Sequence, residues 1–221
     1  MTSDTVLHLD LPLSEKTARS LQLGQMVTVS GRVFTGRSRF HIRAVEDGIL
    51  PPLDFAAVNA FFHVGPVMRR DGDGWRVVSA EPTSSIRFER YGADVVRRLG
   101  LRTLIGKTTM GPGTVAALRD VGGVFLSKIG VCGNLLSKQI SRVREVYFLE
   151  ELGKTEATWV LEVARFGPFF VAIDAHGNSY FEDLGRQAEE RSAEIFRRLG
   201  IDASWGFTAV NPSGGRGKDH A

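Results

Sequence analysis

Residues 91–126, YGADVVRRLGLRTLIGKTTMGPGTVAALRDVGGVFL, decide the fold class. The spacing of apolar residues from Tyr91 to Leu99 predicts a helix that ends at Gly100, and Arg102 to Ile105 follows as a short strand. We expect a second helix over residues 113–121 and a second strand over residues 124–126. Helices that alternate with strands in this way predict an α/β protein with a mixed, partly parallel sheet.

Lys107 lies in the turn between the first of these strands and the helix that follows it, within the stretch IGKTTMGP (105–112). A phosphate-binding loop has four residues between its first glycine and the Gly-Lys-Thr sequence. Here five residues separate Gly100 from Gly106, and most of them belong to the predicted strand. Nucleotide binding through Lys107 is therefore the weakest of our hypotheses. A cation just after a strand is a common ligand-binding group in α/β folds.

The N-terminal half is rich in predicted strands. We expect strands over residues 26–34, 58–64 and 75–80, with Gly31 marking a bulge or a close approach of another segment. A short helix is expected over residues 39–46, ending at Gly48, and residues 71–74 form a hairpin turn.

The C-terminal half contains three more predicted strands, over residues 142–148, 158–164 and 169–174. An amphipathic helix follows over residues 183–199, with Leu184, Ala188, Ile195 and Leu199 on one stripe. We expect one domain over residues 1–205 and a flexible polar tail over residues 206–221.

Composition narrows the class of protein. The chain has 221 residues, 43% of them hydrophobic, and its 28 basic and 25 acidic residues are interspersed. A nucleic-acid partner is not expected because such proteins usually carry a concentrated basic face. Residues 1–10 lack the pattern of a signal peptide, and no run reaches the roughly 20 apolar residues of a membrane span. We expect no membrane association and a cytoplasmic location.

Cys132 is the single cysteine of the chain. One cysteine excludes a disulfide within the chain, and it excludes an iron–sulfur cluster or a Cys-rich zinc site held by this chain alone. Any such cofactor must be held by a partner. We interpret Cys132 itself as a small buried thiol.

Three predicted turns after strands carry polar side chains. Arg37 lies in TGRSRFH (35–41), Thr83 and Arg87 lie in PTSSIR (82–87), and Lys107 lies in the turn described above. Two guanidinium groups and an ammonium group that meet in one cleft would bind a dicarboxylate, because guanidinium pairs with carboxylate through two parallel hydrogen bonds.

Five segments occur in an order that resembles a known family: LQLGQMVTVSGRVFTGRSRFH (21–41), FFHVGPV (61–67), EPTSSIRFERY (81–91), IGKTTMGP (105–112) and FGPFFVAIDAHGN (166–178). The chain resembles the β subunit of class I fumarases and L-tartrate dehydratases, which is equivalent to the C-terminal domain of the single-chain enzymes. The resemblance extends from about residue 9 to about residue 199.

The resemblance implies a swivelling β/β/α domain and a hydro-lyase that is active only with an α subunit. The substrate would be a small hydroxy-dicarboxylate, malate/fumarate or tartrate. A [4Fe-4S] cluster would be held by the α subunit and not by this chain, and would act as a Lewis acid. The assembly would be α2β2 or similar.

The resemblance also implies roles for single residues. Arg37, Arg87 and Lys107 match family residues that contact the substrate carboxylates, and Ser84 and His41 are further candidate substrate contacts. Thr83 matches the residue proposed as the base that moves the proton at the carbon next to the carboxylate. An unaided hydroxyl is a poor base, so neighbouring cations would have to stabilise its alkoxide.

Four residues depart from the family pattern: Ser38 stands for Asp, Ser84 for Thr, Phe88 for Met and Thr108 for Gly. These departures leave the substrate open. They also leave open a second hypothesis, a non-catalytic subunit that binds carboxylates or serves assembly. His41 could contact the substrate or stiffen its loop, whereas we interpret His63 as a core histidine and His176 as part of a structural turn.

Overall fold

The computed structural model describes residues 6–128, 130 and 132–201. These residues form two compact units, with the boundary between Phe181 and Glu182. The first unit is an α/β domain with a mixed, partly parallel sheet, which confirms the predicted fold class. The predicted tail over residues 206–221 lies outside the described residues.

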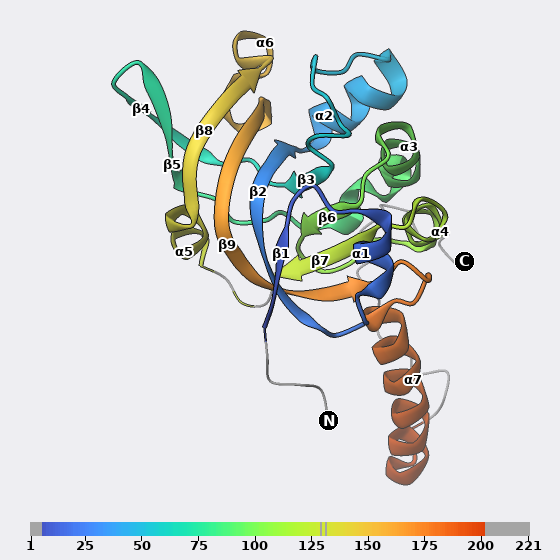
Figure 1. Ribbon diagram of the computed structural model, residues 1–221. Coiled ribbons are helices and arrows are strands. Elements are labelled where there is room, and N and C mark those ends of the chain that lie inside the picture. The colour runs from blue at the N-terminus through green and yellow to red at the C-terminus, as the bar shows by residue number, and fades with distance from the viewer. Residues whose placement is uncertain (1–5, 129, 131, 202–221) are drawn as a thin grey trace, which may run out of the picture. The chain divides into compact units, whose positions relative to one another are not determined.

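Seven strands form the main sheet in the order β1-β2-β3-β6-β7-β9-β8 (Figure 1). Their bounds are β1 (Leu7–Asp10), β2 (Met26–Gly36), β3 (Ala60–His63), β6 (Thr103–Gly106), β7 (Val124–Lys128), β8 (Ile140–Tyr147) and β9 (Thr158–Ile173). The pairs β1–β2, β2–β3, β3–β6 and β6–β7 are parallel, whereas β9 runs antiparallel to β7, β8 and β2. The β2–β9 pairing closes the strands β2, β3, β6, β7 and β9 into a ring.

Each central strand contributes side chains to two hydrophobic cores. Phe62, Ile105 and Leu126 belong to one core, and their neighbours Phe61, Leu104 and Phe125 belong to the other. This division follows from the period of two along a strand, which sends successive side chains to opposite faces. Both faces are therefore buried, as is typical of parallel strands.

Helices and a hairpin surround this sheet. The helical elements of the first unit are α1 (Glu15–Ser20), α2 (Ser38–Ile42), the π-helical turn η1 (Arg43–Asp47), the 3-10 turn η2 (Ser85–Phe88), α3 (Glu89–Leu99), α4 (Pro112–Val121), α5 (Gly133–Lys138) and α6 (Leu149–Glu156). The expected hairpin consists of β4 (Val67–Asp71) and β5 (Gly74–Ser79). The predicted helix over residues 39–46 corresponds to α2 and η1, and it ends at Gly48 in the left-handed region as expected.

Gly31 marks both a bulge and a close approach, as predicted. The β2–β9 register shifts between Val29 and Gly31. Gly31 has a φ of 125°, and a Cβ atom there would lie 2.8 Å from the carbonyl oxygen of Leu11. A glycine is required because other residues rarely adopt this conformation and none would fit the space.

The prediction of two strands over residues 158–164 and 169–174 was wrong, because β9 is one strand of 16 residues. Gly167 and Pro168 lie between the two predicted strands. Instead Val29 pairs with Phe166 and Val27 pairs with Phe169, so β9 carries one extra residue between these partners. A bulge with Gly167 at a φ of 133° lets the strand pass the proline without leaving the sheet.

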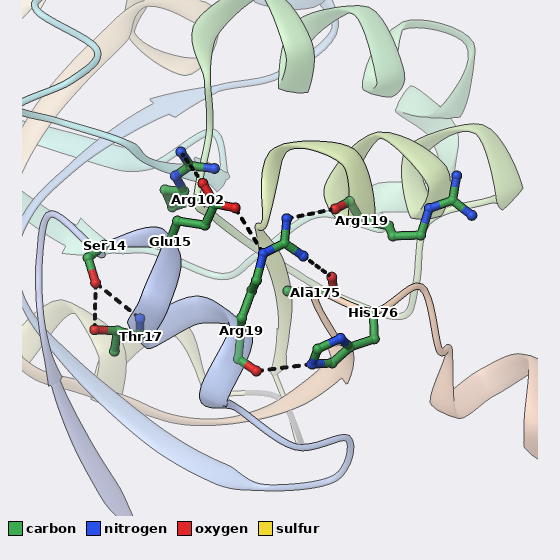
Figure 2. Close-up of polar contacts among 8 residues, drawn as sticks. All are labelled: Ser14, Glu15, Thr17, Arg19, Arg102, Arg119, Ala175 and His176. Carbon is green, nitrogen blue, oxygen red and sulfur yellow. Dashed lines mark hydrogen bonds and ion pairs between the residues drawn. The ribbon is translucent and has the colours of Figure 1, made fainter.

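A cluster of charged residues connects α1 to α4 and to the segments next to β6 and β9 (Figure 2). The Arg19 guanidinium donates to Glu15 at 2.9 Å, to the carbonyl of Ala175 at 3.0 Å and to the carbonyl of Arg119 at 3.3 Å. Glu15 also pairs with Arg102 at 3.4 Å, and His176 Nε2 lies 3.0 Å from the carbonyl oxygen of Arg19. We call this group of five residues (Glu15, Arg19, Arg102, Arg119, His176), in which Arg119 contributes its backbone carbonyl, the α1 clamp.

The turn that carries His176 is structural, as predicted. The Asp174 carboxylate accepts hydrogen bonds from the backbone amides of His176 and Asn178, both at 2.9 Å, and from the Asn178 side chain at 2.7 Å. Such an Asx turn reproduces a backbone turn with a side chain. The ring of His176 then reaches the α1 clamp.

The second unit begins with the main part of α7 (Tyr180–Leu199), which confirms the predicted C-terminal helix. No described residue of α7 is buried, and Leu184, Ile195 and Leu199 are 43%, 49% and 67% exposed. These apolar side chains of α7 are therefore exposed.

None of the helices in the described ranges combines the length and the apolar character that a membrane span requires.

Candidate active site

The ends of three neighbouring parallel strands form one side of a pocket of about 370 Å³. Arg37 follows β2, Gly65 follows β3 and Lys107 follows β6. The carboxyl ends of adjacent parallel strands meet at one edge of a sheet, so residues distant in sequence converge there. The rest of the lining comes from the segment after β5, namely Glu81, Pro82, Thr83, Ser84 and Arg87.

Five of the six predicted site residues therefore lie together: Arg37, Thr83, Ser84, Arg87 and Lys107. The sixth, His41, is not among the lining residues, and its side chain is buried with the residue only 1% exposed. The helical twist of α2 turns Phe40 and His41 toward the core while Ser38 and Arg39 face outward. His41 can thus act on a ligand only through another residue.

The segment 82–85 runs alongside the strand ends as an extension of the sheet. Thr83 donates its backbone N–H to the carbonyl of His63 at 2.9 Å, and Ser85 donates to the carbonyl of Lys107 at 3.0 Å. A parallel β-bridge joins Ser84 to Lys107, and an antiparallel one joins Val64 to Pro82. These backbone contacts place the small hydroxyl residues directly beside the lysine turn.

Thr83 and Arg87 are in direct contact within the pocket. Arg87 Nη2 donates to Thr83 Oγ1 at 2.5 Å. The two residues are four apart, and the 3-10 turn η2 brings the guanidinium back over the hydroxyl. A guanidinium at this distance stabilises negative charge on the threonine oxygen.

Arg37 is held by an acid from a distant part of the chain. Its Nε lies 3.8 Å from Glu156 Oε1, at the end of α6, and Glu156 Oε2 accepts the backbone N–H of Arg39 at 3.0 Å. Ser38, which stands where the family pattern has an acid, is exposed. Glu156 therefore supplies a carboxylate at this turn, and only the tertiary structure reveals it.

The lysine turn does not resemble a phosphate-binding loop. The backbone N–H of Lys107 already donates to Ser85 Oγ at 3.3 Å, so it is not free to contact a phosphate. Thr108 adopts the left-handed region with a φ of 67°, which is unusual for a β-branched residue. Beyond the turn, Glu89 accepts hydrogen bonds from Gly111 at 2.7 Å and from the Thr114 amide at 3.1 Å, which fixes the start of α4.

Two buried histidines lie behind the pocket. His41 Nδ1 donates to the carbonyl of Arg37 at 2.8 Å, and its ring stacks on Phe88 with centroids 4.4 Å apart. Burial lowers the pKa of His41 to about 4, although its bond to the Arg37 carbonyl opposes that change. Burial also lowers the pKa of His63 well below its usual value, with a smaller contribution from His41. Both rings are neutral at neutral pH.

Glu81 is a pocket residue that sequence reasoning missed. It is the one acid among the lining residues, and both of its carboxylate oxygens are buried without a hydrogen-bond partner among the described residues. A buried carboxylate without a partner is unfavourable, so its presence calls for a reason. Its position two residues before Thr83 in an extended segment was the available signal, because such residues share one face.

Cys132 is exposed, so its interpretation as a buried thiol was wrong. It lies at the N-terminal boundary of α5 rather than within a strand or a packed helix face, which leaves its side chain outside the core. Within the described ranges no group of three or more His, Cys, Asp or Glu residues is arranged to hold a metal ion.

The chemistry of the pocket is that of an anion site. Three cationic side chains and one carboxylate line it, together with two small hydroxyl groups. Its volume suits a small molecule, and the guanidinium and ammonium groups come from different segments. A ligand with two carboxylates can therefore be bound at both ends.

Comparisons with known proteins agree with this chemistry. The family model described as Fumarase C-terminus matches residues 2–184. A Methanocaldococcus jannaschii protein provisionally named L(+)-tartrate dehydratase subunit beta is 34% identical over 83% of this chain and 95% of its own length. The Escherichia coli L(+)-tartrate dehydratase subunit beta is 30% identical over 86% of this chain and 94% of its own length. A Geobacillus stearothermophilus protein provisionally named class I fumarate hydratase is 36% identical over 86% of this chain, which covers 36% of that longer protein.

Proposed function

The chain belongs to the fumarase C-terminus family, and from that premise we propose that it is the β subunit of a hydro-lyase. The reaction is the reversible removal of water from a small hydroxy-dicarboxylate, malate or tartrate. The names of the relatives support the reaction class. The cationic pocket supports the class of substrate, because it offers separate positive groups to two carboxylates.

The contact between Arg87 and Thr83 is the observation that carries the proposal. Dehydration removes a proton from the carbon next to one carboxylate and hydroxide from the adjacent carbon. The oxygen of Thr83, as an alkoxide stabilised by the Arg87 guanidinium, takes that proton and becomes a neutral hydroxyl. The hydroxide departs as water once it is protonated, and a carbon–carbon double bond remains.

Arg37 and Lys107 bind the substrate carboxylates in this proposal. Both side chains line the pocket, and they follow different strands, so they approach the ligand from different directions. The carboxylate next to the reacting carbon gains negative charge as the proton leaves, and a nearby cation stabilises that charge in the transition state. Ser84 is a further hydrogen-bonding group beside Lys107.

An iron–sulfur cluster belongs to the proposal only through a partner. No ligand set for a metal occurs in the described part of this chain, and its sequence has a single cysteine. The family resemblance implies a [4Fe-4S] cluster, and in this proposal an α subunit holds it; the term "subunit beta" in the names of relatives suggests an assembly of two kinds of chain. The cluster would supply Lewis-acid chemistry at the leaving hydroxyl. The α2β2 arrangement and the cytoplasmic location remain parts of the proposal.

The experiment is anaerobic co-expression with a candidate α subunit, followed by assays with malate, fumarate and L-tartrate. The wild-type pair is compared with Thr83→Ala and with Thr109→Ala, a matched control in the turn after Lys107 whose residue is not among those that line the pocket. We expect Thr83→Ala alone to lose turnover. A wild-type pair with an intact cluster that dehydrates none of these substrates would contradict the proposal.

The same experiment decides the alternative of a non-catalytic carboxylate-binding or assembly subunit. That alternative requires Thr83→Ala to match the wild-type pair in every assay. Full turnover by the variant would place the proton transfer on the α subunit and leave this chain as a carboxylate-binding partner.

A further inference from the structure

Two buried residues beneath the pocket connect the lining residues to one another. His63 is 1% exposed and Ser85 is fully buried, and neither lines the pocket. Ser85 Oγ lies 3.0 Å from His63 Nδ1 and accepts the backbone N–H of Lys107 at 3.3 Å. The backbone N–H of Ser85 donates in turn to the carbonyl of Lys107. Ser85 therefore holds both polar groups of the Lys107 backbone.

His63 extends this connection to the proposed base. Its carbonyl oxygen accepts the backbone N–H of Thr83 at 2.9 Å, while its ring holds Ser85. The ring is packed between Phe61, Phe88 and His41, with centroid distances of 4.8, 5.0 and 5.2 Å. Because packing fixes the orientation of the ring, His63 defines the separation between Thr83 and the lysine turn.

The space around Ser85 is shaped for this contact. A Cβ atom on Gly106, the last residue of β6, would lie 1.9 Å from Ser85 Oγ. The volume that a side chain would occupy at the end of the strand is therefore filled by the serine hydroxyl. The contact thus depends on a glycine at position 106, because any side chain there would displace the Ser85 hydroxyl.

We infer that Ser85 and His63 are positioning residues, which fix Thr83 relative to Lys107. The inference rests on the proposed function, in which Thr83 and Lys107 act on one substrate. A misplacement of a reacting group by about 1 Å can cost about a hundredfold in rate, so a rigid link between the two is a functional requirement.

The first test measures geometry and does not depend on activity. Hydrogen exchange of the Lys107 amide is followed by NMR in the wild-type chain, in Ser85→Ala and in Ser179→Ala. Ser179 is the matched control because it is 2% exposed and its Oγ has no hydrogen-bond partner among the described residues. We expect exchange at Lys107 to accelerate at least about tenfold in Ser85→Ala only, as its acceptor is lost. Unchanged exchange would overturn the inference.

The second test measures catalysis by the reconstituted pair. We expect Ser85→Ala to lower kcat about ten- to a hundredfold while KM changes only a few-fold, because the loss falls on the alignment of Thr83 in the transition state. His63→Asn keeps a hydrogen-bonding group near the position of Nδ1, and it should retain much more of kcat than His63→Leu. Equal kcat and KM in Ser85→Ala and wild type would overturn the inference.

The two proposals fail in different ways. An inactive wild-type pair overturns the proposed function before any variant is made, whereas the exchange rate of the Lys107 amide still shows whether Ser85 fixes the lysine turn. An active pair in which His63→Leu and His63→Asn lose kcat equally, with equal melting temperatures, contradicts the positioning role of the His63 ring alone.

Discussion

The α1 clamp and the pocket each combine arginines with one glutamate, but their charged groups are used differently. In the clamp, Arg19 has three acceptors and Glu15 has two cationic partners. In the pocket, the two Glu81 oxygens and Arg37 Nε make no hydrogen bond with a described residue, and the same holds for the Nε2 atoms of the two histidines behind it. Charged groups that satisfy one another hold elements together, whereas the charged groups of the pocket keep hydrogen-bonding capacity that the described residues do not use.

The largest effect that we expect is a loss of stability at low pH that comes from the histidines behind the pocket. The pKa of His41 is about 4 in the fold, against about 6.5 in the unfolded chain. The unfolded state therefore binds more protons between these values, so the free energy of unfolding falls as the pH drops through this window, by about 3 kcal/mol at pH 4 from His41 alone. His63 adds a loss of the same sign.

Urea unfolding at pH 7 and pH 5 measures this loss in the part of the window where carboxylates contribute least. His41→Gln should flatten the dependence of stability on pH. Equal stability of the wild-type chain at pH 7 and pH 5 would show that the histidines behind the pocket are not held neutral by burial.

The second prediction removes one cation from the pocket. Lys107→Met should weaken binding of L-tartrate to the isolated chain about thirtyfold, since a hydrogen bond between charged groups contributes about 1.5–3 kcal/mol. The melting temperature should not fall, because three like charges gather in this pocket. Calorimetric titration and thermal unfolding check the two outcomes. A large loss of stability with unchanged binding would show that Lys107 stabilises the fold and does not bind the ligand.

The third prediction removes the central cation of the clamp. Arg19→Met should lower the free energy of unfolding by about 1–2 kcal/mol, because the carbonyls of Ala175 and Arg119 lose their donor. Binding of L-tartrate should match the wild type. Urea unfolding with a parallel titration is the measurement, and weaker binding would indicate that the clamp and the pocket are coupled.

The fourth prediction concerns the acid of the pocket. Glu81→Gln removes the negative charge that opposes an anionic ligand, so L-tartrate should bind several-fold more tightly, which corresponds to about 1 kcal/mol. Arg87→Gln, which removes a positive charge from the same pocket, should weaken the binding of L-tartrate. If Glu81→Gln weakens binding instead, the carboxylate is a hydrogen-bond acceptor for the ligand rather than a repelling charge.

The smallest expected effect lies in the backbone. Thr108→Gly should stabilise the chain by about 0.5–1 kcal/mol, because a β-branched residue is strained at a φ of 67° and glycine is not, although glycine loses more entropy on folding. Thermal unfolding checks this. A loss of stability would mean that the bond from the Thr108 hydroxyl to the Lys107 carbonyl outweighs the strain.

Local patterns predicted most of the fold, but not its closure. The spacing of apolar residues predicted the alternating strands and helices around Lys107 and the helix after residue 182, and a glycine within a strand predicted the bulge at Gly31. All of these signals come from residues close together in sequence. The continuity of β9 does not, because a Gly-Pro pair breaks a strand unless a partner strand accepts the bulge. That partner, β2, lies more than a hundred residues earlier.

The candidate site shows the same division. Arg37, Thr83, Arg87 and Lys107 could be chosen because cations and hydroxyls follow predicted strands, and parallel strands bring such ends together. The acid that holds Arg37 could not be identified, because Glu156 is contributed by a distant helix. Ser85 could not be separated from Ser84, since only the register of segment 82–85 against Lys107 decides which hydroxyl faces inward.

The exposed Cys132 has a practical consequence for all of these measurements. It is the one thiol of the chain, and the next residue, Gly133, packs so closely on the pocket segment that a Cβ there would lie 2.9 Å from the backbone nitrogen of Glu81. A maleimide fluorophore attached to the unmodified protein would therefore lie next to the pocket wall. Occupancy of the pocket could then be followed optically, without introducing or removing a cysteine.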